Sequence, residues 1–383
     1  ARVLNSLTKH SQTTEYRFER LYRILFNEEM YYLAYQRIYA RPGNMTQGAD
    51  GETIDRMSLP RIEKLILSLK DESYSPQPSR RMYIPKKNGK TRPLGVPSFD
   101  DKLVQEVVRM VLEAIYEGHF EDTSHGFRPH RSCHTALNAV QKTFTGKKWF
   151  IEGDIKGFFD NIDHDIMMLF LEHEIEDKNF LRYIRRFLKS GILEDYKYYE
   201  SDKGTPQGGL ISPILANVYL HYVLDNWFNV IKKSFKGEIY LIRYADGFVV
   251  MFQYEKEARK FYNMLIGRMH KFKLELAEDK TRILPFGRFK GTKEEFNFLG
   301  FTFSNGETLN GKYRPNIKTN KKKLKQKFEI AKKWLHDKMH EPILEVGTSI
   351  RKKIIGHYAY YGINGNYSSL LKYYKHLKYT WYY

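Results

Sequence analysis

Two apolar segments that each lead to an aspartate constrain the fold of this chain most strongly. Residues 149–154 predict a strand that ends in Asp154, and residues 239–251 predict two apolar strands around a turn that carries Asp246. If these strands are neighbours in one sheet, the two carboxylates meet at one edge of it. Each aspartate alone also has a structural explanation, because Asp-Gly favours hairpin turns and a strand-end Asp can cap a turn or a helix.

Pro, Gly and Asn residues punctuate the chain and divide it into four stretches. Residues 1–72 are predicted to be mainly helical. Residues 73–148 begin with a basic hairpin, whose turn contains Asn88-Gly89, and continue as a helix. Residues 149–312 mix strands with helices, and residues 313–383 are helical and basic.

Three local patterns give sharper expectations. The segment Ser98-Phe-Asp-Asp101 fits a capping box, followed by a helix with apolar residues near helical spacing. Residues 296–303 have the pattern of a strand. One face of the basic C-terminal stretch is predicted to be apolar, and its members are Leu324, Phe328, Ala331, Leu335 and Met339.

The balance of charged and aromatic residues favours a polyanionic partner. The 383 residues carry a formal net charge of +19, and 15% of them are aromatic, which suits phosphate contacts together with stacking on bases. A single cysteine, Cys133, excludes an internal disulfide and a cysteine-based metal site. No apolar run is long enough to cross a bilayer, so we expect no membrane partner.

Phosphoryl transfer with two metal ions is a reaction that paired carboxylates at a sheet edge would serve. Such sites hold two Mg²⁺ ions about 3.5–4 Å apart, and rigid elements keep that geometry constant. Asp154 and Asp246 are therefore candidate ligands, and the backbone carbonyl of Ile155 is a further candidate.

Three other features suit a nucleotide site, and each also has a plain structural interpretation. The ring of Phe159 fits a wall against a ribose 2′-OH, or a core position. The Gly-rich loop 204–213 lets backbone approach a nucleotide, with Gln207 as donor and acceptor, or is a turn before a helix. The hairpin that carries Lys86 and Arg92 fits a triphosphate, or is a solvated turn.

The beginning of the C-terminal stretch is rich in lysine. Seven Lys and one Glu lie between residues 320 and 333, around the apolar face. A run of this kind is usually a solvated helix face, but in a chain this basic it favours a face that contacts phosphates. The lysines that we single out are Lys321, Lys322, Lys323, Lys325 and Lys327.

Taken in order, these pieces resemble the reverse transcriptases encoded by bacterial group II introns, over roughly residues 40–383. A Tyr-x-Asp triplet alone is a weak signal, whereas seven ordered blocks are a specific one. The blocks are RPLGVP (92–97), HGFRP (125–129), FIEGDIKGFF (150–159), GTPQGGLISPILAN (204–217), RYAD (243–246), EDKT (278–281) and FLGF (298–301).

The resemblance implies an α+β polymerase with the shape of a right hand. It implies a helical N-terminal extension of the non-retroviral type over residues 1–72 and fingers over residues 73–148. The palm, an antiparallel sheet with helices and the active site, would cover residues 149–312. A helical thumb that leads into a maturase region would cover residues 313–383.

The resemblance also implies roles for single residues. Asp154, Ile155 and Asp246 become ligands of two Mg²⁺ ions, or of Mn²⁺ in their place, and the two aspartates become catalytic. The implied nucleotide-binding residues are Lys86, Arg92, Phe159, Gln207 and Lys280, with Phe159 as the gate against ribonucleotides. The implied nucleic-acid contacts are Phe298, Leu299 and Gly300 in the primer grip and Lys321, Lys322, Lys323, Lys325 and Lys327 in the thumb.

The implied activity is RNA-dependent DNA synthesis, in which a primer 3′-OH attacks the α-phosphate of a dNTP. The implied partners are intron RNA, an RNA template with a DNA primer, target DNA and dNTPs. The protein would also assist splicing and mobility of its intron. Its expected location is the bacterial cytoplasm, as a ribonucleoprotein associated with the nucleoid.

The hairpin departs from the family in one position. The family usually has two Asp residues there, and in this chain Gly247 occupies the second position. Because the second carboxylate of the family is the less direct ligand, we expect polymerase activity to survive, with a weaker metal site or an altered preference among divalent ions. Two alternatives stay open, an RNA-binding maturase with a weakened or decayed polymerase site and a defence-associated or diversity-generating reverse transcriptase.

Overall fold

A four-stranded sheet carries both aspartates at one edge. The computed structural model describes residues 2–13, 15–41, 43, 45–85, 91–206, 208–288, 293–308 and 310–382. The strands of this sheet are β6 (Ile239–Tyr244), β7 (Gly247–Phe252), β3 (Trp149–Asp154) and β8 (Arg282–Pro285), in that spatial order. β3 pairs antiparallel with β7, and Asp154 lies opposite Gly247. The expectation that these strands are neighbours is confirmed.

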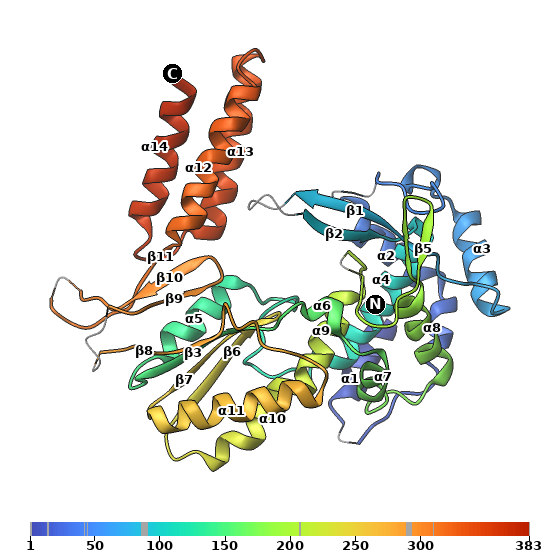
Figure 1. Ribbon diagram of the computed structural model, residues 1–383. Helices are drawn as coiled ribbons and strands as arrows, with labels where there is room; N and C mark the ends of the chain where they lie inside the picture. The colour runs from blue at the N-terminus through green and yellow to red at the C-terminus, as the bar shows by residue number, and fades with distance from the viewer. Residues whose placement is uncertain are drawn as a thin grey trace.

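Helices cover both faces of this sheet (Figure 1). One face is covered by α5 (Cys133–Thr143) and the other by α11 (Glu255–Lys271). The remaining helices from the middle of the chain are α6 (Phe158–Asn161), α7 (His164–Leu171), α8 (Lys178–Lys189), α9 (Ser212–Leu220) and α10 (Asn226–Ile231). Ile151 and Val250 face the core that includes α11, while Phe150 and Val249 face the core that includes α5. Because successive strand residues point to opposite faces, a sheet covered on both sides needs apolar residues throughout.

The N-terminal stretch is mainly helical, as predicted. It contains α1 (Arg2–Ser11), α2 (Glu28–Tyr39), α3 (Leu59–Lys70) and two 3-10 turns, Leu21–Phe26 and Ile54–Arg56. Both α1 and α2 pack on α4 (Phe99–Tyr116). The predicted apolar face of α4 is fully buried, and its members are Leu103, Val107, Val111 and Ile115.

A second sheet lies beside these helices (Figure 1). Its strands are β2 (Thr91–Val96), β1 (Ser79–Pro85), β4 (Ile192–Glu194) and β5 (Lys197–Tyr199), in that spatial order. β1 and β2 are antiparallel, so the two strands of the predicted basic hairpin are confirmed. The turn itself, at residues 86–90, lies outside the described residues.

The capping box predicted at the start of α4 is only half formed. The Ser98 hydroxyl accepts a hydrogen bond of 3.1 Å from the Asp101 N–H. The predicted reciprocal bond, from the Ser98 N–H to the Asp101 side chain, is replaced by others. The buried Asp101 carboxylate accepts from the Tyr74 hydroxyl and, over 2.9 Å, from the Gln77 N–H. Asp101 therefore fastens the segment before β1 to α4.

The strand predicted over residues 296–303 is two strands. β9 (Glu295–Phe298) and β10 (Phe301–Ser304) form a hairpin whose turn residues, Leu299 and Gly300, both have positive φ. All four phenylalanines of the hairpin, at 296, 298, 301 and 303, are buried. β11 (Asn316–Thr319) joins this sheet from the stretch predicted to be helical.

Three helices follow and project away from the central sheet (Figure 1). They are α12 (Lys321–Asp337), α13 (Ile343–Tyr361) and α14 (Tyr367–Tyr382). Leu324, Ala331 and Leu335 of α12 are buried with partly buried Phe328 beside them, but Met339 lies beyond the end of α12 and is 62% exposed, so its place on this face was wrongly predicted. No helix in the described part of the chain is long and apolar enough to span a bilayer.

Candidate active site

Asp246 lies at the tip of the β6–β7 hairpin. Ala245 before it has a φ of 55°, a left-handed conformation that is uncommon outside glycine. The Ile155 N–H donates a hydrogen bond of 3.3 Å to the Asp246 carbonyl, which ties the tip to the end of β3. Burial raises the pKa of the Asp246 carboxyl, and the adjacent Asp154 carboxylate raises it further. This pair of carboxylates therefore favours a nearby positive charge.

Lys280 supplies such a charge. Its Nζ donates a hydrogen bond of 2.7 Å to Oδ2 of Asp154, and this bond raises the pKa of Lys280 above its usual range. The neighbouring segment also fixes the backbone, because the Asp154 N–H donates to Thr281 Oγ1 over 3.4 Å and the Ala277 N–H donates to the Asp154 carbonyl over 2.8 Å. Residues 277–281 thus hold the end of β3.

An open cleft of about 840 Å³ contains both carboxylates. Predicted site residues in its lining are Asp154, Asp246, Lys280, Phe298, Leu299, Gly300 and Lys323. These residues come from β3, from the turns before β7 and β8, from β9 and the turn after it, and from the first turn of α12. The fold therefore brings the carboxylate pair, the lysine and the proposed primer grip into one space.

Two other predicted nucleotide-binding residues, Phe159 and Arg92, lie outside this lining. Phe159 is half-buried, and its ring meets that of Phe127 edge-on at 6.4 Å. Arg92 is exposed on β2. Lys86 and Gln207 lie outside the described residues. The roles of all four residues remain predictions.

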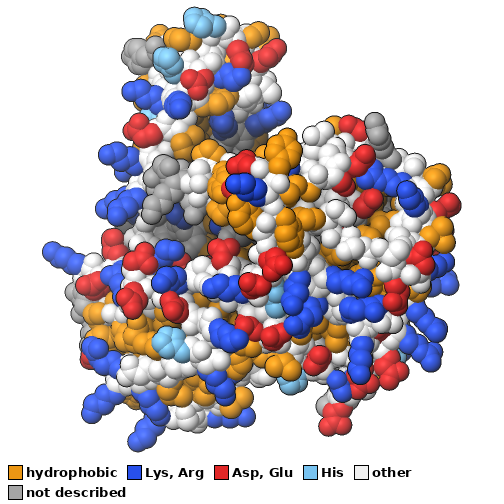
Figure 2. Space-filling view, turned by 45° about the vertical axis from the view of Figure 1, so that its right-hand side comes forward, with side chains coloured by type: hydrophobic (Ala, Val, Ile, Leu, Met, Phe, Trp, Pro, Cys, Tyr) orange, Lys and Arg blue, Asp and Glu red, His pale blue; other side chains and the backbone are white. Residues whose placement is uncertain are grey.

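The five predicted lysines of α12 differ in their surroundings. The exposed ones are Lys321, Lys322, Lys323 and Lys325. Lys327 is half-buried, with its Nζ 3.1 Å from His357 Nδ1 and 4.7 Å from the ring centre of Tyr361, so it also packs α12 against α13. Lys and Arg side chains are spread over the projecting helices and the rest of this face of the molecule (Figure 2).

A buried ion pair next to the β6–β7 hairpin was not predicted from the sequence. Arg243 of β6 and Asp225 are both fully buried, with Nη2 and Oδ2 2.6 Å apart. The available signal is an arginine inside an otherwise apolar strand, because a fully buried charge requires a partner. The identity of the partner had no comparable signal.

The carboxylate pair fits a divalent cation. In the parts of the chain that the structure describes, no group of three or more His, Cys, Asp and Glu side chains could hold a metal ion. Mg²⁺ in nucleotide-using enzymes is usually bound by one or two carboxylates, with substrate phosphates and water completing its shell. Asp154 and Asp246 offer that donor set, and hard oxygen ligands suit Mg²⁺ or Mn²⁺.

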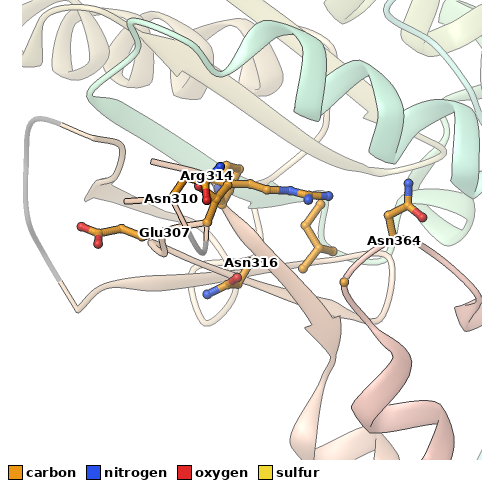
Figure 3. Close-up of a pocket in the computed structure, with 9 residues that line it drawn as sticks. Glu307, Asn310, Arg314, Asn316 and Asn364 are labelled. Atoms are coloured by element: carbon orange, nitrogen blue, oxygen red, sulfur yellow. The ribbon is translucent and has the colours of Figure 1, made fainter. Parts of the chain in front are cut away.

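A second cavity, of about 470 Å³, lies beside β11 and the turn between α13 and α14. Figure 3 shows its polar lining, with Arg314 extended towards the side of Asn364 and Glu307 turned the other way. Glu307 is the one carboxylate among the described lining residues, so this cavity has no carboxylate pair. We therefore assign the chemistry to the cleft that contains Asp154 and Asp246.

The class of protein follows from the sheet, its carboxylate pair and one family model. The model for reverse transcriptase (RNA-dependent DNA polymerase) matches residues 84–303, which is more than half of the chain. The chain belongs to the reverse transcriptase family and has its α+β right-hand fold. The matched range includes β3, the β6–β7 hairpin and Lys280.

Among relatives, the chain is similar to group II intron-encoded protein LtrA of Lactococcus lactis subsp. cremoris, with 45% identity over 284 residues, 74% of this chain and 45% of that protein. It is 34% identical to protein YkfC of Escherichia coli over 70% of this chain and 80% of that protein. A solved telomerase from Candida albicans matches with a TM-score of 0.49 and 15% identity, over 79% of this chain and 56% of that chain. The chain spans less than half of the length of LtrA.

Proposed function

We propose that this chain is the RNA-dependent DNA polymerase part of a group II intron-encoded protein. The observation that carries the proposal is the meeting of Asp154 and Asp246 at one sheet edge, which follows from the pairing of Asp154 with Gly247 across β3 and β7. Similarity to an intron-encoded protein over 74% of the chain favours a group II intron as its source over a defence-associated or diversity-generating system.

In this proposal Asp154 and Asp246 hold two divalent ions, Mg²⁺ or Mn²⁺, with the Ile155 carbonyl as a further ligand. Such ions, when bound, lower the pKa of an attacking hydroxyl and stabilise charge on a departing pyrophosphate. Asp246 is half-buried, and this partial removal from water strengthens electrostatic interactions at this edge. Lys280 reaches the same edge and offers its ammonium to the polyphosphate.

Residues around the carboxylates would select and position the substrates. Phe159, braced by Phe127, would be the wall that a ribose 2′-OH cannot pass. The proposed nucleotide contacts besides this ring are Lys86, Arg92, Gln207 and Lys280. The proposed contacts with the primer end and the duplex are Phe298, Leu299 and Gly300 and Lys321, Lys322, Lys323, Lys325 and Lys327.

The proposed substrates are dNTPs and an RNA template with a DNA primer, and the proposed partners are intron RNA and target DNA. The net charge of +19 supports polyanionic partners. The fingers at 73–148, the palm at 149–312 and the thumb from 313 onwards are part of the proposal. The bacterial source of LtrA supports a bacterial host, and a cytoplasmic ribonucleoprotein associated with the nucleoid is part of the proposal.

The test is primer extension on an RNA template with dNTPs and Mg²⁺. We expect the unmodified chain to extend the primer and Asp154→Ala to lose at least about a thousandfold in rate, because a metal ligand supports several kcal/mol of transition-state stabilisation. Asp202→Ala, which removes an exposed carboxylate elsewhere, is the matched control and should keep its rate. Equal rates for Asp154→Ala and the control would exclude the site.

One observation favours a second candidate, an RNA-binding maturase without polymerase activity. Gly247 stands opposite Asp154 where the family usually has a further Asp. Tight binding of intron RNA with no nucleotide incorporation by the unmodified chain would favour this candidate. Incorporation that depends on Asp154 would reject it.

A further inference from the structure

The buried ion pair of Arg243 and Asp225, next to the β6–β7 hairpin, also contacts the surrounding segments. Nε and Nη2 of Arg243 donate to the two carboxylate oxygens of Asp225 over 2.8 and 2.6 Å. Both side chains are 0% exposed. Since burying two charges carries a desolvation cost that their attraction barely offsets, a pair like this is weak evidence for a role in stability alone.

The other side-chain N–H groups of Arg243 contact the hairpin turn and two neighbouring segments. Nη1 donates to the Ala245 carbonyl over 2.9 Å and to the Asn217 amide oxygen over 3.2 Å, and Nη2 donates to the Ser124 hydroxyl over 2.8 Å. With the two bonds to Asp225, the guanidinium uses its full set of five donors. The bond to Ala245 acts directly on the left-handed residue that precedes Asp246.

A π-helical turn puts Asp225 in reach. It spans His221–Asp225, between α9 and α10. Residues of a regular α-helix advance about 100° each, so Asn217 and Asp225, eight positions apart, would point about 80° away from each other. A π turn adds one residue to the helix, which returns Asp225 to the side of Asn217. Both side chains then contact Arg243.

The loop before α5 closes the arrangement from the other side. The Arg243 N–H donates to the Thr123 carbonyl over 2.8 Å, and the Asn217 amide donates to the Gly126 carbonyl over 2.8 Å. A Cβ at Gly126 would lie 2.5 Å from the Ala245 nitrogen. A glycine is therefore required for this loop to touch the hairpin turn.

We propose that Arg243, Asp225 and Gly126 form a positioning unit for Asp246. The unit holds Ala245 in its left-handed conformation, so that the Asp246 carboxylate stays beside Asp154 in the arrangement that a divalent ion requires. Arg243 acts through the turn and touches no substrate. This inference rests on the proposed metal site, and outer groups that orient a metal ligand typically change metal affinity by about 10–100-fold.

The test measures Mn²⁺ binding to the full chain by electron paramagnetic resonance, with no nucleotide or primer present. Asp154→Ala identifies the signal of this site. Arg243→Lys keeps a charge for Asp225 but lacks the fork that reaches Ala245. Gly126→Ala presses on the turn without changing any charge. The matched control is Arg109→Lys on α4, which weakens a largely buried pair with fully buried Glu106, away from the cleft.

We expect Arg243→Lys and Gly126→Ala each to weaken Mn²⁺ binding by about tenfold or more, while Arg109→Lys binds Mn²⁺ like the unmodified chain. Thermal unfolding checks that the variants are folded, and if Arg243→Lys fails to fold, Gly126→Ala carries the test. Undiminished Mn²⁺ affinity in a folded Arg243→Lys or Gly126→Ala chain would overturn the proposal, as would a chain that binds no Mn²⁺ at all. Mn²⁺ binding that behaves as expected in a chain without primer extension would reject the polymerase function and leave the positioning unit standing.

Discussion

Lys280 and Asp154 form a direct ion pair in the cleft, with Nζ and Oδ2 2.7 Å apart. The lysine side chain is 60% exposed and the aspartate 24% exposed, so the ammonium reaches the carboxylate from the solvent side. An ammonium at this oxygen offsets the charge of the carboxylate pair. A divalent ion that binds Asp154 must therefore compete with Lys280.

The first prediction concerns this competition. Lys280→Ala should bind Mn²⁺ more tightly in the absence of nucleotide, because the ammonium no longer occupies Asp154. A half-exposed ion pair is worth about 0.2–1 kcal/mol, so the gain should be at most about fivefold. Primer extension should nevertheless slow, since the ammonium that we propose to contact the polyphosphate is lost. Mn²⁺ titration and extension rates measure the two effects.

The control for this prediction is Lys156→Ala. Lys156 lies two residues beyond Asp154 and forms an ion pair with Glu275 over 3.2 Å. The side chains of Lys156 and Glu275 are both well exposed. Its removal should leave Mn²⁺ affinity unchanged. A loss of Mn²⁺ affinity in Lys280→Ala would mean that the lysine assists metal binding and would contradict the competition.

The second prediction concerns the pH dependence of stability. Burial raises the pKa of Asp101 from 3.8 to about 6. Because the folded-state pKa lies above the unfolded one, the stabilisation from the protonated form is complete below about pH 4 and is lost as the pH rises through about 6. Two pKa units correspond to about 3 kcal/mol. Asp101 should therefore lower the unfolding free energy by roughly that amount across this window.

Asp101→Asn tests this by comparison with the unmodified chain. The amide keeps the size of the side chain. Its oxygen can accept from the Gln77 N–H and its N–H can donate to the Tyr74 hydroxyl oxygen, whereas alanine would leave both buried groups unpaired. Denaturant unfolding from pH 4 to pH 6.5 should show the unmodified chain losing stability relative to the variant. Parallel pH profiles would show that Asp101 does not titrate in this range.

The central sheet could be predicted from sequence because its physics is local and strong. β7 is buried on both faces and has a continuous apolar run, and β3 begins with three apolar residues. The Asp246-Gly247 turn marks the hairpin between β6 and β7. The β9–β10 hairpin was wrongly predicted as one strand, because its two short strands give one nearly continuous apolar pattern. Its phenylalanines at 296, 298, 301 and 303 all lie on one face only because two residues, Leu299 and Gly300, form the turn.

The positioning unit could not be predicted in the same way. Arg243 and Asp225 are 18 residues apart, and their contact depends on a π-helical turn that no local pattern announces. Gly126 contacts the turn through backbone alone, so its role appears only when a Cβ is placed in the folded chain. Tertiary packing determines both the Arg243–Asp225 contact and the approach of Gly126 to the turn, so neither could be predicted from sequence periodicity.

The third prediction concerns the choice of sugar. Phe159→Ala should admit ribonucleotides, and the ratio of dNTP to rNTP incorporation should fall by about ten- to a hundredfold, because the substitution removes the proposed wall against the 2′-OH. Phe127→Ala removes only the ring that braces Phe159 at 6.4 Å, so it should lower the ratio less. Single-nucleotide incorporation with each substrate measures the ratio. An unchanged ratio in Phe159→Ala would exclude it as the gate.

The last prediction concerns the missing second aspartate. A side chain fits at position 247, because a Cβ there would meet only the Tyr244 carbonyl oxygen, at an ordinary 3.7 Å, and the backbone is not left-handed. Gly247→Asp should therefore fold. It lies opposite Asp154, so it adds a third carboxylate to the edge that the two aspartates share. The Mg²⁺ concentration for half-maximal primer extension should fall severalfold.

Gly247→Asn separates charge from size, because its amide fills the same space without a negative charge. It should fold like Gly247→Asp but should leave the Mg²⁺ requirement close to that of the unmodified chain. A carboxylate that binds metal needs its charge, whereas a carboxylate that merely stiffens the turn does not. If both variants lower the Mg²⁺ requirement equally, the glycine weakens the site through turn flexibility. If neither changes the rate or the metal dependence, Gly247 does not limit metal binding.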